Sequence, residues 1–583
     1  MNQINLNNSR IQKLKKLYHI SFELIHEYGF TYFLRIAFEE LFKQKGNLFS
    51  PDTISQEIKN EFILNYDDFL KNQLKKSQLQ LKIQSFFATP LFSLVLFVGK
   101  NNPSIQKILK TQAYDNFDFI LISSIEKHID SFVSKNNISR YQKLVISFPK
   151  IHDILSVSKS DYFIFLNNFS VLQSDFLFNI VDKINQNFLG DVYYCDEDFI
   201  EKNEKRINPF FKPDWSPYLL RSFNYIGNSF IISKQLLNKL SNFVLDSKNF
   251  HYDLLLHCAE ISDKFIHVSV PCCSILQTPK IDQKQILSQH IQRLGLNAVV
   301  ETGKAPNTLR VHYLLQSEPK ISIIIPTKNN KSFLKRCIES LENNTNYKNF
   351  EIIIIDNNTD DSETLEYYHS LDYEIISYKD PFNFSKMNNL GVTKSHGDYI
   401  LCLNDDTKAI DPNWLTEMVS ICQQNDVGIV GAKLLHSNGT VQHAGAVFLK
   451  SGSGFHIFEN ILENDEGFFN LHNVIRDFSA VTGACLLIKK SIFDKIGGYD
   501  DTFDLFYGDG DLCLKTIAAG FHVVYTPFAR LLHEGSATIK KNSEVFFAIE
   551  NHFSFINKWP YLKQGDPFYN YNLGWNYSIA KPT

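Results

Sequence analysis

The chain has 583 residues, a formal net charge of −4, and 44% hydrophobic against 21% charged residues. This length exceeds what one hydrophobic core supports and predicts two or three domains. The composition argues against long disordered stretches, and the near-neutral charge excludes the strongly basic surface of a nucleic-acid-binding protein. Nine cysteines are scattered without a Cys-x-x-Cys pair, which is typical of a reducing compartment rather than of a zinc or redox site.

Membrane and export signals are missing from the sequence. The longest apolar runs, such as residues 92–98, have the length of a strand and fall far below the roughly 20 residues of a spanning helix. No early segment combines a charged start, an apolar run and a small-residue cleavage site. We therefore expect a cytoplasmic protein.

Residues 1–85 are predicted to form a helical N-terminal segment. Apolar side chains recur there at three- and four-residue spacing, as at Leu14, Leu17, Tyr18, Phe22 and Ile25. Basic residues between positions 10 and 16 lie beside them. Such a helix either packs on its own protein or lies on a membrane surface, because amphipathicity alone does not separate the two.

The rest of the chain alternates strands and helices twice, which is typical of parallel α/β folds. In the first half the predicted strands cover residues 92–98, 117–122 and 161–166. A connector over 281–318 contains one predicted helix, around 285–294. The same rhythm restarts in the second half, with predicted strands at 321–327, 351–356, 399–403 and, shorter, 427–431. The two halves therefore indicate an internal duplication at low similarity.

Polar residues follow the strands of the second half. The carboxyl ends of the first two carry Pro326-Thr327-Lys328 and Asp356, at the edge where open α/β sheets bind nucleotides. The third strand runs into Asn404-Asp405-Asp406. Clustered carboxylates at a strand end can hold a hard divalent cation against a diphosphate. Read alone, the same residue types are explained equally well by a turn or a helix N-cap.

An ordered series of short motifs runs through residues 320–575. They are SIIIPTKN (322–329), FSKMNNLG (384–391), GDYILCLNDDT (397–407), QHAG (442–445), TGAC (482–485), GGYD (497–500), GDGDLCLK (508–515), HEGS (533–536) and DPFYN (566–570). This series resembles glycosyltransferase family 2, of the GT-A fold, and most of all the bacterial enzymes that build O-antigen and other surface glycans.

The resemblance implies two tandem GT-A domains, which are Rossmann-like with a mostly parallel sheet, and a catalytic domain at 319–583. It implies metal-dependent, inverting transfer of a sugar from a nucleotide-sugar donor to a growing cell-surface glycan such as O-antigen, lipopolysaccharide or capsule. The implied cofactor is a divalent cation, Mn²⁺ or Mg²⁺. A lipid-linked acceptor would bring the protein into peripheral contact with the inner membrane face.

The resemblance also assigns roles to single residues. Asp406 and His533 are the candidate metal ligands, and Asp509 is the candidate general base, with Asp511 as the second candidate. On a helix these two carboxylates would not share a face, and both could instead cap a helix that begins near residue 512. Asn404 and Gly508 are departures, because the family usually has acids at both positions.

Further residues are candidates for binding the nucleotide sugar. They are Pro326, Thr327, Lys328, Asp356, Lys386, Asn389, Asn404, Asp405 and Gly483. Asp356 either accepts a hydrogen bond from a base imide or starts a loop. Lys386 and Asn389 either contact the donor or belong to the polar surface of a helix. Gly483 would permit close approach of a sugar.

The first half also resembles a family 2 domain, through DVYYCDED (191–198), PFFKPDW (209–215) and NYIG (224–227). Its third strand, however, is followed by Asn167-Asn168-Phe169, which offers no carboxylate to a hard cation. We therefore expect a degenerate, inactive GT-A-like domain over 86–280. The alternatives are a bifunctional enzyme in which Asp196-Glu197-Asp198 replaces the lost motif, and a non-catalytic glycan-binding or scaffold protein.

Overall fold

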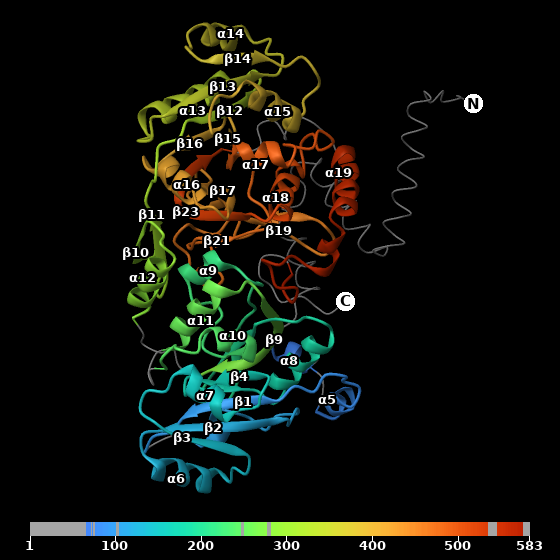
Figure 1. Ribbon diagram of the computed structural model, residues 1–583. Coiled ribbons are helices and arrows are strands. Elements are labelled where there is room, and N and C mark those ends of the chain that lie inside the picture. The colour runs from blue at the N-terminus through green and yellow to red at the C-terminus, as the bar shows by residue number, and fades with distance from the viewer. Residues whose placement is uncertain are drawn as a thin grey trace, which may run out of the picture.

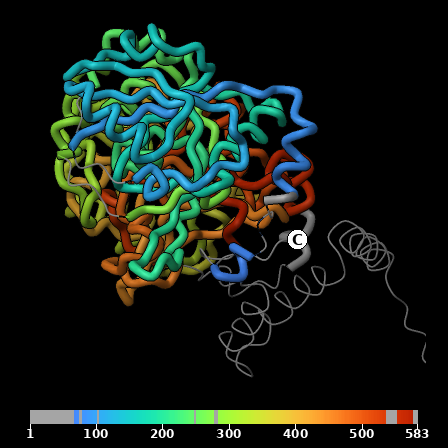
Figure 2. The backbone as a smooth tube through the Cα atoms, turned by 90° about the horizontal axis from the view of Figure 1, so that it is seen from below, coloured from blue at the N-terminus to red at the C-terminus, as the bar shows by residue number. Residues whose placement is uncertain are grey.

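The computed structural model describes residues 66–71, 73, 76–100, 104–245, 250–276, 282–534 and 545–574. Two α/β bodies are stacked one on the other along the long axis of the molecule (Figure 1). Viewed along that axis, the first body lies in front of the second (Figure 2). Most of the predicted N-terminal helical segment lies outside the described residues, and only its helices α4 (Tyr66–Lys71) and α5 (Lys76–Ile83) are described.

The first body is built on a nine-stranded sheet of order β3-β2-β1-β4-β8-β6-β9-β5, with β7 paired to β6. Its strands are β1 (Phe92–Phe97), β2 (Phe117–Ser123), β3 (Tyr141–Val145), β4 (Tyr162–Phe165), β5 (Ser170–Leu172), β6 (Val192–Ile200), β7 (Arg206–Phe210), β8 (Phe230–Ser233) and β9 (Phe265–Ile275). Its helices are α6 (Glu126–Asn136), α7 (Ile151–Val157), α8 (Phe176–Asn185), α9 (Pro217–Ser222), α10 (Lys234–Lys239) and α11 (Phe250–Ile261).

The second body is built on a ten-stranded sheet of order β14-β13-β12-β15-β22-β17-β23-β16, with β18 and β21 paired to β17 and β23. The strands of this sheet are β12 (Ile321–Thr327), β13 (Phe350–Asp356), β14 (Glu374–Ser377), β15 (Tyr399–Leu403), β16 (Thr407–Ala409), β17 (Val427–Leu435), β18 (Val441–His443), β21 (Arg476–Asp477), β22 (Cys485–Lys489) and β23 (His522–His533). A separate hairpin is formed by β19 (Ala446–Phe448) and β20 (Gly454–His456). The helices are α13 (Lys331–Asn343), α14 (Ser362–His369), α15 (Phe384–Lys394), α16 (Trp414–Cys422), α17 (Lys490–Lys495), α18 (Gly508–Ala518) and α19 (Val545–Lys558).

The two sheets have the same strand order, which confirms the predicted pair of Rossmann-like bodies. In each, the first strand pairs in parallel with the second and fourth strands, and the fourth pairs antiparallel with a late strand. In each, a long late strand (β9 or β23) pairs antiparallel with the short strand that follows the fourth (β5 or β16). Positions in the two bodies can therefore be compared through their strand register.

Buried apolar runs explain why the central strands form where predicted. Ile321 to Ile325 of β12 are all buried, as expected for a strand that has parallel neighbours on both sides and is covered on both faces. The strand predicted over 427–431 is longer, because β17 continues to Leu435 and all nine of its residues are buried. Strand β23 pairs in parallel with β17 from Val427 to Leu435, and this pairing extends β17 beyond its predicted end.

The connector between the bodies contains more structure than predicted. Helix α12 (Gln283–Arg293) lies where a helix was expected, and the antiparallel hairpin of β10 (Ala298–Thr302) and β11 (Leu309–Tyr313) was missed. Helix α12 packs on α11 of the first body, and β11 packs on both α9 and α16. The connector therefore touches both bodies.

The C-terminal segment of the second body reaches back into the first body. Asn570 Nδ2 donates to both carboxylate oxygens of Asp196, at 3.0 and 3.1 Å, and to Lys212 O at 3.0 Å. The backbone N–H of Asp214 donates to Pro567 O at 2.7 Å. The contacts of Asn570 are buried, and those to the Asp196 carboxylate are hydrogen bonds to a charged group that help to hold the two bodies together.

The acidic run of β6 is neutralised inside the protein. Asp196 lies 2.7 Å from His267, Glu197 lies 3.1 Å from Lys212, and Asp198 lies 2.6 Å from Arg206. Burial by itself would lower the pKa of His267, but the neighbouring carboxylates of Asp196 and Asp214 outweigh it and raise the pKa to about 9. A protonated His267 therefore balances the buried Asp196 at neutral pH.

Two further observations concern the setting of the protein. All nine cysteines are buried and free. Among the helices of the described ranges, none is long and apolar enough to cross a bilayer.

We predict that Asn570→Asp destabilises the protein by about 3 kcal/mol or more, because it removes a donor and sets a second buried carboxylate against Asp196. Thermal unfolding monitored by circular dichroism should give a lower midpoint, and the loss should grow as the pH rises above the carboxyl range. The same change at the exposed Asn343 is the control and should leave the midpoint within about a degree. An unchanged midpoint for Asn570→Asp would show that this contact does not stabilise the interface.

Candidate functional site

The candidate site lies at the carboxyl end of the second sheet. Parallel register pairs Thr327 at the end of β12 with Asp356 at the end of β13, and β12 also runs parallel to β15. The loop of Asn404, Asp405 and Asp406 follows β15 directly. The predicted nucleotide-binding and metal-binding positions are therefore brought to one edge, as expected for an open α/β sheet.

Asp405 connects two of these strand ends. Its Oδ2 accepts a hydrogen bond from Thr327 Oγ1 at 2.6 Å and another from Asn330 Nδ2 at 3.0 Å. Burial raises the pKa of Asp405 to about 6, with the Asp406 charge adding to the shift and these hydrogen bonds opposing it. Thr327 is thereby occupied as a support for the loop, while Lys328 beside it is exposed.

Asp406 and His533 meet because two strands pair next to them. Antiparallel register sets Thr407 of β16 opposite His533 at the end of β23. His533 Nε2 lies 3.0 Å from Asp406 Oδ1 and 3.3 Å from Asn404 Nδ2. The two predicted metal ligands, which are far apart in the sequence, are therefore adjacent in space.

The residues present fit a divalent cation. Asp406 Oδ1 is buried and accepts no hydrogen bond from the described residues, so it is a carboxylate oxygen without a donor. A carboxylate oxygen and an imidazole nitrogen together suit manganese, and a carboxylate suits magnesium. No group of three or more acidic, histidine or cysteine side chains forms a ligand cluster in the described part of the chain. The protein would supply two ligands, leaving the other positions to diphosphate oxygens and water.

Asp509 lies in the first turn of α18 and is held by backbone donors. Its Oδ2 accepts from Gly483 N at 3.0 Å and its Oδ1 from Gly510 N at 2.8 Å. Gly483 precedes Ala484, whose carbonyl accepts from Asn404 N at 3.1 Å. This chain of contacts sets Asp509 beside the loop that carries Asp406. A Cβ on Gly483 would lie 3.0 Å from the ring of Phe384, so this glycine is needed for close packing.

Asp511 lies on a different face of α18, as predicted for two residues of one helix. It is fully buried and accepts from Lys558 Nζ at 2.8 Å and from Trp559 Nε1 at 2.9 Å. It therefore anchors the end of α19 to α18. The expectation of a helix starting near residue 512 is wrong, because α18 begins at Gly508.

The departure at Gly508 has a steric explanation. A Cβ at this position would lie 2.7 Å from Ser385 Oγ of α15. An acid cannot be accommodated there unless α15 or that side chain shifts. The preceding residue, Tyr507, has a left-handed backbone (φ 68°) and its hydroxyl lies 2.9 Å from His552 Nδ1 of α19. Neither Tyr507 nor His552 was singled out from the sequence.

Two more residues that were predicted to bind the nucleotide sugar, Asp356 and Asn389, form hydrogen bonds within the protein. Asp356 accepts from Thr359 N at 3.2 Å and from Tyr368 Oη at 3.1 Å, and so organises the loop after β13. Asn389 donates to Tyr499 O at 3.0 Å and accepts from Tyr499 N at 3.0 Å. Lys386, in the first turn of α15, is exposed. The Asn389 side chain is thus engaged within the protein, whereas the Lys386 side chain is exposed to solvent.

Gln442 of β18 is a site residue that the analysis of the sequence missed. Its Oε1 lies within hydrogen-bond distance of His533 Nδ1, and its Nε2 donates to His533 O at 3.3 Å. Its signal in the sequence is its place in the QHAG motif (442–445), one of the motifs that carry the resemblance but assign no role to a glutamine.

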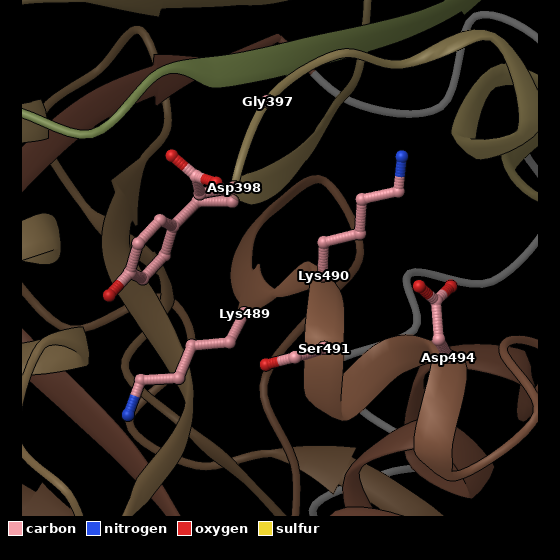
Figure 3. Close-up of a pocket in the computed structure, with 7 residues that line it drawn as sticks. Gly397, Asp398, Lys489, Lys490, Ser491 and Asp494 are labelled. Carbon is pink, nitrogen blue, oxygen red and sulfur yellow. The ribbon is translucent and has the colours of Figure 1, made fainter.

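A surface hollow of about 430 Å³ lies at the opposite end of β15 (Figure 3). It is lined by Gly397, Asp398, Tyr399, Lys489, Lys490, Ser491 and Asp494. Both lysines donate to backbone carbonyls, Lys489 to Gln424 and Lys490 to Ser395. Because the carboxylates gather at the other end of the strand, this hollow is not the candidate site.

The second body therefore has a mixed α/β sheet with carboxylates and a histidine gathered at the carboxyl edge of its parallel strands, which is where open α/β sheets bind ligands. Residues 322–497 match the model of the family described as Glycosyl transferase family 2. The chain therefore contains a family 2 glycosyltransferase domain, as the motif series predicted.

Curated relatives extend the match beyond this domain. The chain is 30% identical over 527 residues to the uncharacterised protein y4gI of Sinorhizobium fredii, across 83% of this chain and 58% of that protein. It is 33% identical over 400 residues to the O-antigen biosynthesis protein RfbC of Myxococcus xanthus, across 65% of this chain and 31% of that protein. The chain thus spans less than two thirds of the length of either relative.

Among solved structures, GalNAc-T7 with UDP, GalNAc and Mn²⁺ aligns at 16% identity with a TM-score of 0.35. The alignment covers 42% of this chain and 50% of that one.

We predict that Asp405→Asn stabilises the protein above pH 6 and not near pH 4. A folded-state pKa of about 6, against 3.8 for the free carboxyl, means that the folded state loses stability as the pH rises between these values. The amide keeps one oxygen for Thr327 and Asn330, and the shift corresponds to at most about 3 kcal/mol. Thermal unfolding in a chelating buffer across pH 4 to 8 measures this effect. A difference between the proteins that does not change with pH would contradict it, and the exposed Asp398→Asn is the matched control.

Proposed function

We propose that the second body is a metal-dependent, inverting glycosyltransferase that uses a nucleotide-sugar donor. The observation that carries this proposal is the 3.0 Å approach of His533 Nε2 to a buried oxygen of Asp406 that accepts no hydrogen bond from the described residues. Asp406 and His533 would hold Mn²⁺ or Mg²⁺. When bound, the cation neutralises the charge that develops on the leaving diphosphate.

Asp509 is the proposed general base. The acceptor hydroxyl attacks the anomeric carbon while the bond from that carbon to the diphosphate oxygen breaks, and the Asp509 carboxylate takes the hydroxyl proton. Its two backbone hydrogen bonds fix the carboxylate in place, which favours one approach direction for the acceptor. Asp511 is disfavoured as the base because it is buried and bound to Lys558 and Trp559.

We further propose that the first body is inactive. Matching strand pairs assign Asn167, Asn168 and Phe169 to the positions of the second-body loop, and Ser170 of β5 pairs with Ile275 where Thr407 pairs with His533. Phe169 and Ile275 would therefore stand in for Asp406 and His533, and neither side chain can bind a cation. The alternative of a second active site at the acids of β6 is disfavoured because those acids are paired and buried.

Assembly of a surface glycan such as O-antigen, lipopolysaccharide or capsule is the proposed setting. The similarity to RfbC supports it, and the nine buried free cysteines fit a reducing compartment. We propose a lipid-linked glycan as the acceptor, reached from the cytoplasm by peripheral contact with the inner membrane face. A panel of nucleotide sugars, screened for hydrolysis with Mn²⁺ or Mg²⁺, would identify the donor, and no metal-stimulated hydrolysis of any donor would count against the proposed function.

We predict that Asp509→Asn lowers the rate of transfer by about 10²- to 10⁴-fold and leaves nucleotide binding intact, because only proton removal from the acceptor is lost. Single-turnover transfer and calorimetric titration with the nucleoside diphosphate of the donor measure the two effects. Asp494→Asn, at an exposed position in the hollow at the opposite end of β15, is the control. Full transfer by the Asp509 variant would remove this residue from the role of base.

We predict that Asp406→Ala abolishes the dependence of nucleotide binding on Mn²⁺ or Mg²⁺, because the only proposed carboxylate ligand is lost. Calorimetric titration with nucleoside diphosphate, with and without metal, checks this. Asp398→Ala, at the other end of the same strand, should behave like the parent. Metal-dependent transfer that persists in the Asp406 variant would point to activity in the first body.

A further inference from the structure

We infer that Gln442 is a positioning residue that fixes the proton of His533 on Nδ1 and so keeps Nε2 free to bind the cation. The inference rests on the metal site proposed above. It concerns a residue outside the proposed ligand pair that holds one of the two ligands through both ends of its amide group.

The orientation of the Gln442 amide follows from a backbone group. A carbonyl oxygen can only accept a hydrogen bond, so the group 3.3 Å from His533 O has to be the Gln442 NH₂. The other end of the amide, facing His533 Nδ1, is then the carbonyl oxygen Oε1, which also can only accept. The proton of a neutral imidazole must therefore be on Nδ1.

The surroundings of the other ring nitrogen agree with this tautomer. An unprotonated Nε2 has a lone pair directed toward Asn404 Nδ2, a donor at 3.3 Å, and toward Asp406 Oδ1 at 3.0 Å. A lone pair beside a carboxylate oxygen that has no donor is unfavourable alone and becomes favourable when a cation lies between them. Asn404, which replaces an expected acid, supplies the N–H group from which the Nε2 lone pair accepts a hydrogen bond.

Gln442 itself is held by its neighbours. Its backbone carbonyl faces His456 Nδ1 at 3.2 Å, and the adjacent His443 accepts from Thr482 N at 3.3 Å. His443 also pairs with Leu434 of β17. The amide is thus presented from an anchored strand, which is what a partner that orients a metal-binding histidine requires.

The test measures Mn²⁺ binding to the full chain without any sugar nucleotide, by the loss of the electron paramagnetic resonance signal of free Mn²⁺. Gln442→Met keeps the length of the side chain and removes both hydrogen bonds to His533. We expect it to weaken Mn²⁺ binding about 10- to 100-fold. Gln442→Glu keeps an acceptor for Nδ1–H and should bind Mn²⁺ at least several-fold more tightly than Gln442→Met.

A spectroscopic signature separates this role from a general structural one. Electron spin-echo modulation detects the ¹⁴N of an imidazole bound to Mn²⁺, and it should be present in the parent and in Gln442→Glu and absent in His533→Ala. In Gln442→Met, saturated with Mn²⁺, it should be weakened or lost. Gln423→Leu is the matched control, because Gln423 also donates to a backbone carbonyl, that of Ser317, far from the site.

The outcomes separate this inference from the proposed function. If Asp406→Ala binds Mn²⁺ as the parent does, the metal site fails and the inference fails with it. If Asp406→Ala loses binding while Gln442→Met keeps the affinity and the ¹⁴N signal of the parent, only the role of Gln442 is overturned. If Gln442→Met does not fold, weaker Mn²⁺ binding by Gln442→Glu than by the Gln423→Leu control overturns the inference.

Discussion

The pairing of two strands of very different length governs the site. Strand β16 has three residues and β23 has twelve, and their antiparallel register sets Thr407 opposite His533. A shift of one residue would turn His533 to the other face of the sheet and separate it from Asp406. The long strand is held in turn by its parallel pairing with the buried β17. The proposed metal site of the second body thus depends on a register that the central sheet enforces.

Much of the fold could be predicted because buried strands of a parallel sheet read as apolar runs. The bounds of β12 and β15 agree with prediction, since each run ends at a clear change to polar residues. The hairpin of β10 and β11 was missed because its residues are only partly buried and its strands are short. The extension of β17 to Leu435 was missed because it depends on β23, which lies about a hundred residues further along.

The candidate site likewise divides into residues that could be predicted from the sequence and residues that could not. Asp406, His533 and Asp509 could be named from the ordered motifs, and the structure brings the first two together. The contacts of Asp511 with Lys558 and Trp559 could not be foreseen, because they join elements that have strand β23 between them in the chain and depend on which face of α18 is covered. Gln442 was invisible for a related reason, since its significance lies in what its amide touches and not in its type. Charged residues in a sequence indicate candidate catalytic or metal-binding positions directly, whereas the neutral residues that orient them give no such indication.

The hold of Asn570 on Asp196 has a consequence for how this protein can change. A repeated domain without contacts to its neighbour would be free to drift or to be deleted. Here the C-terminal segment of one copy donates hydrogen bonds to the buried Asp196 carboxylate of the other, whose charge is balanced by His267, and to the backbone carbonyl of Lys212. Separating the two bodies at the connector would leave the Asp196 carboxylate without Asn570 as a hydrogen-bond donor. It would also expose the surfaces that the two bodies bury against each other. The two bodies repeat one architecture, and buried hydrogen bonds join them.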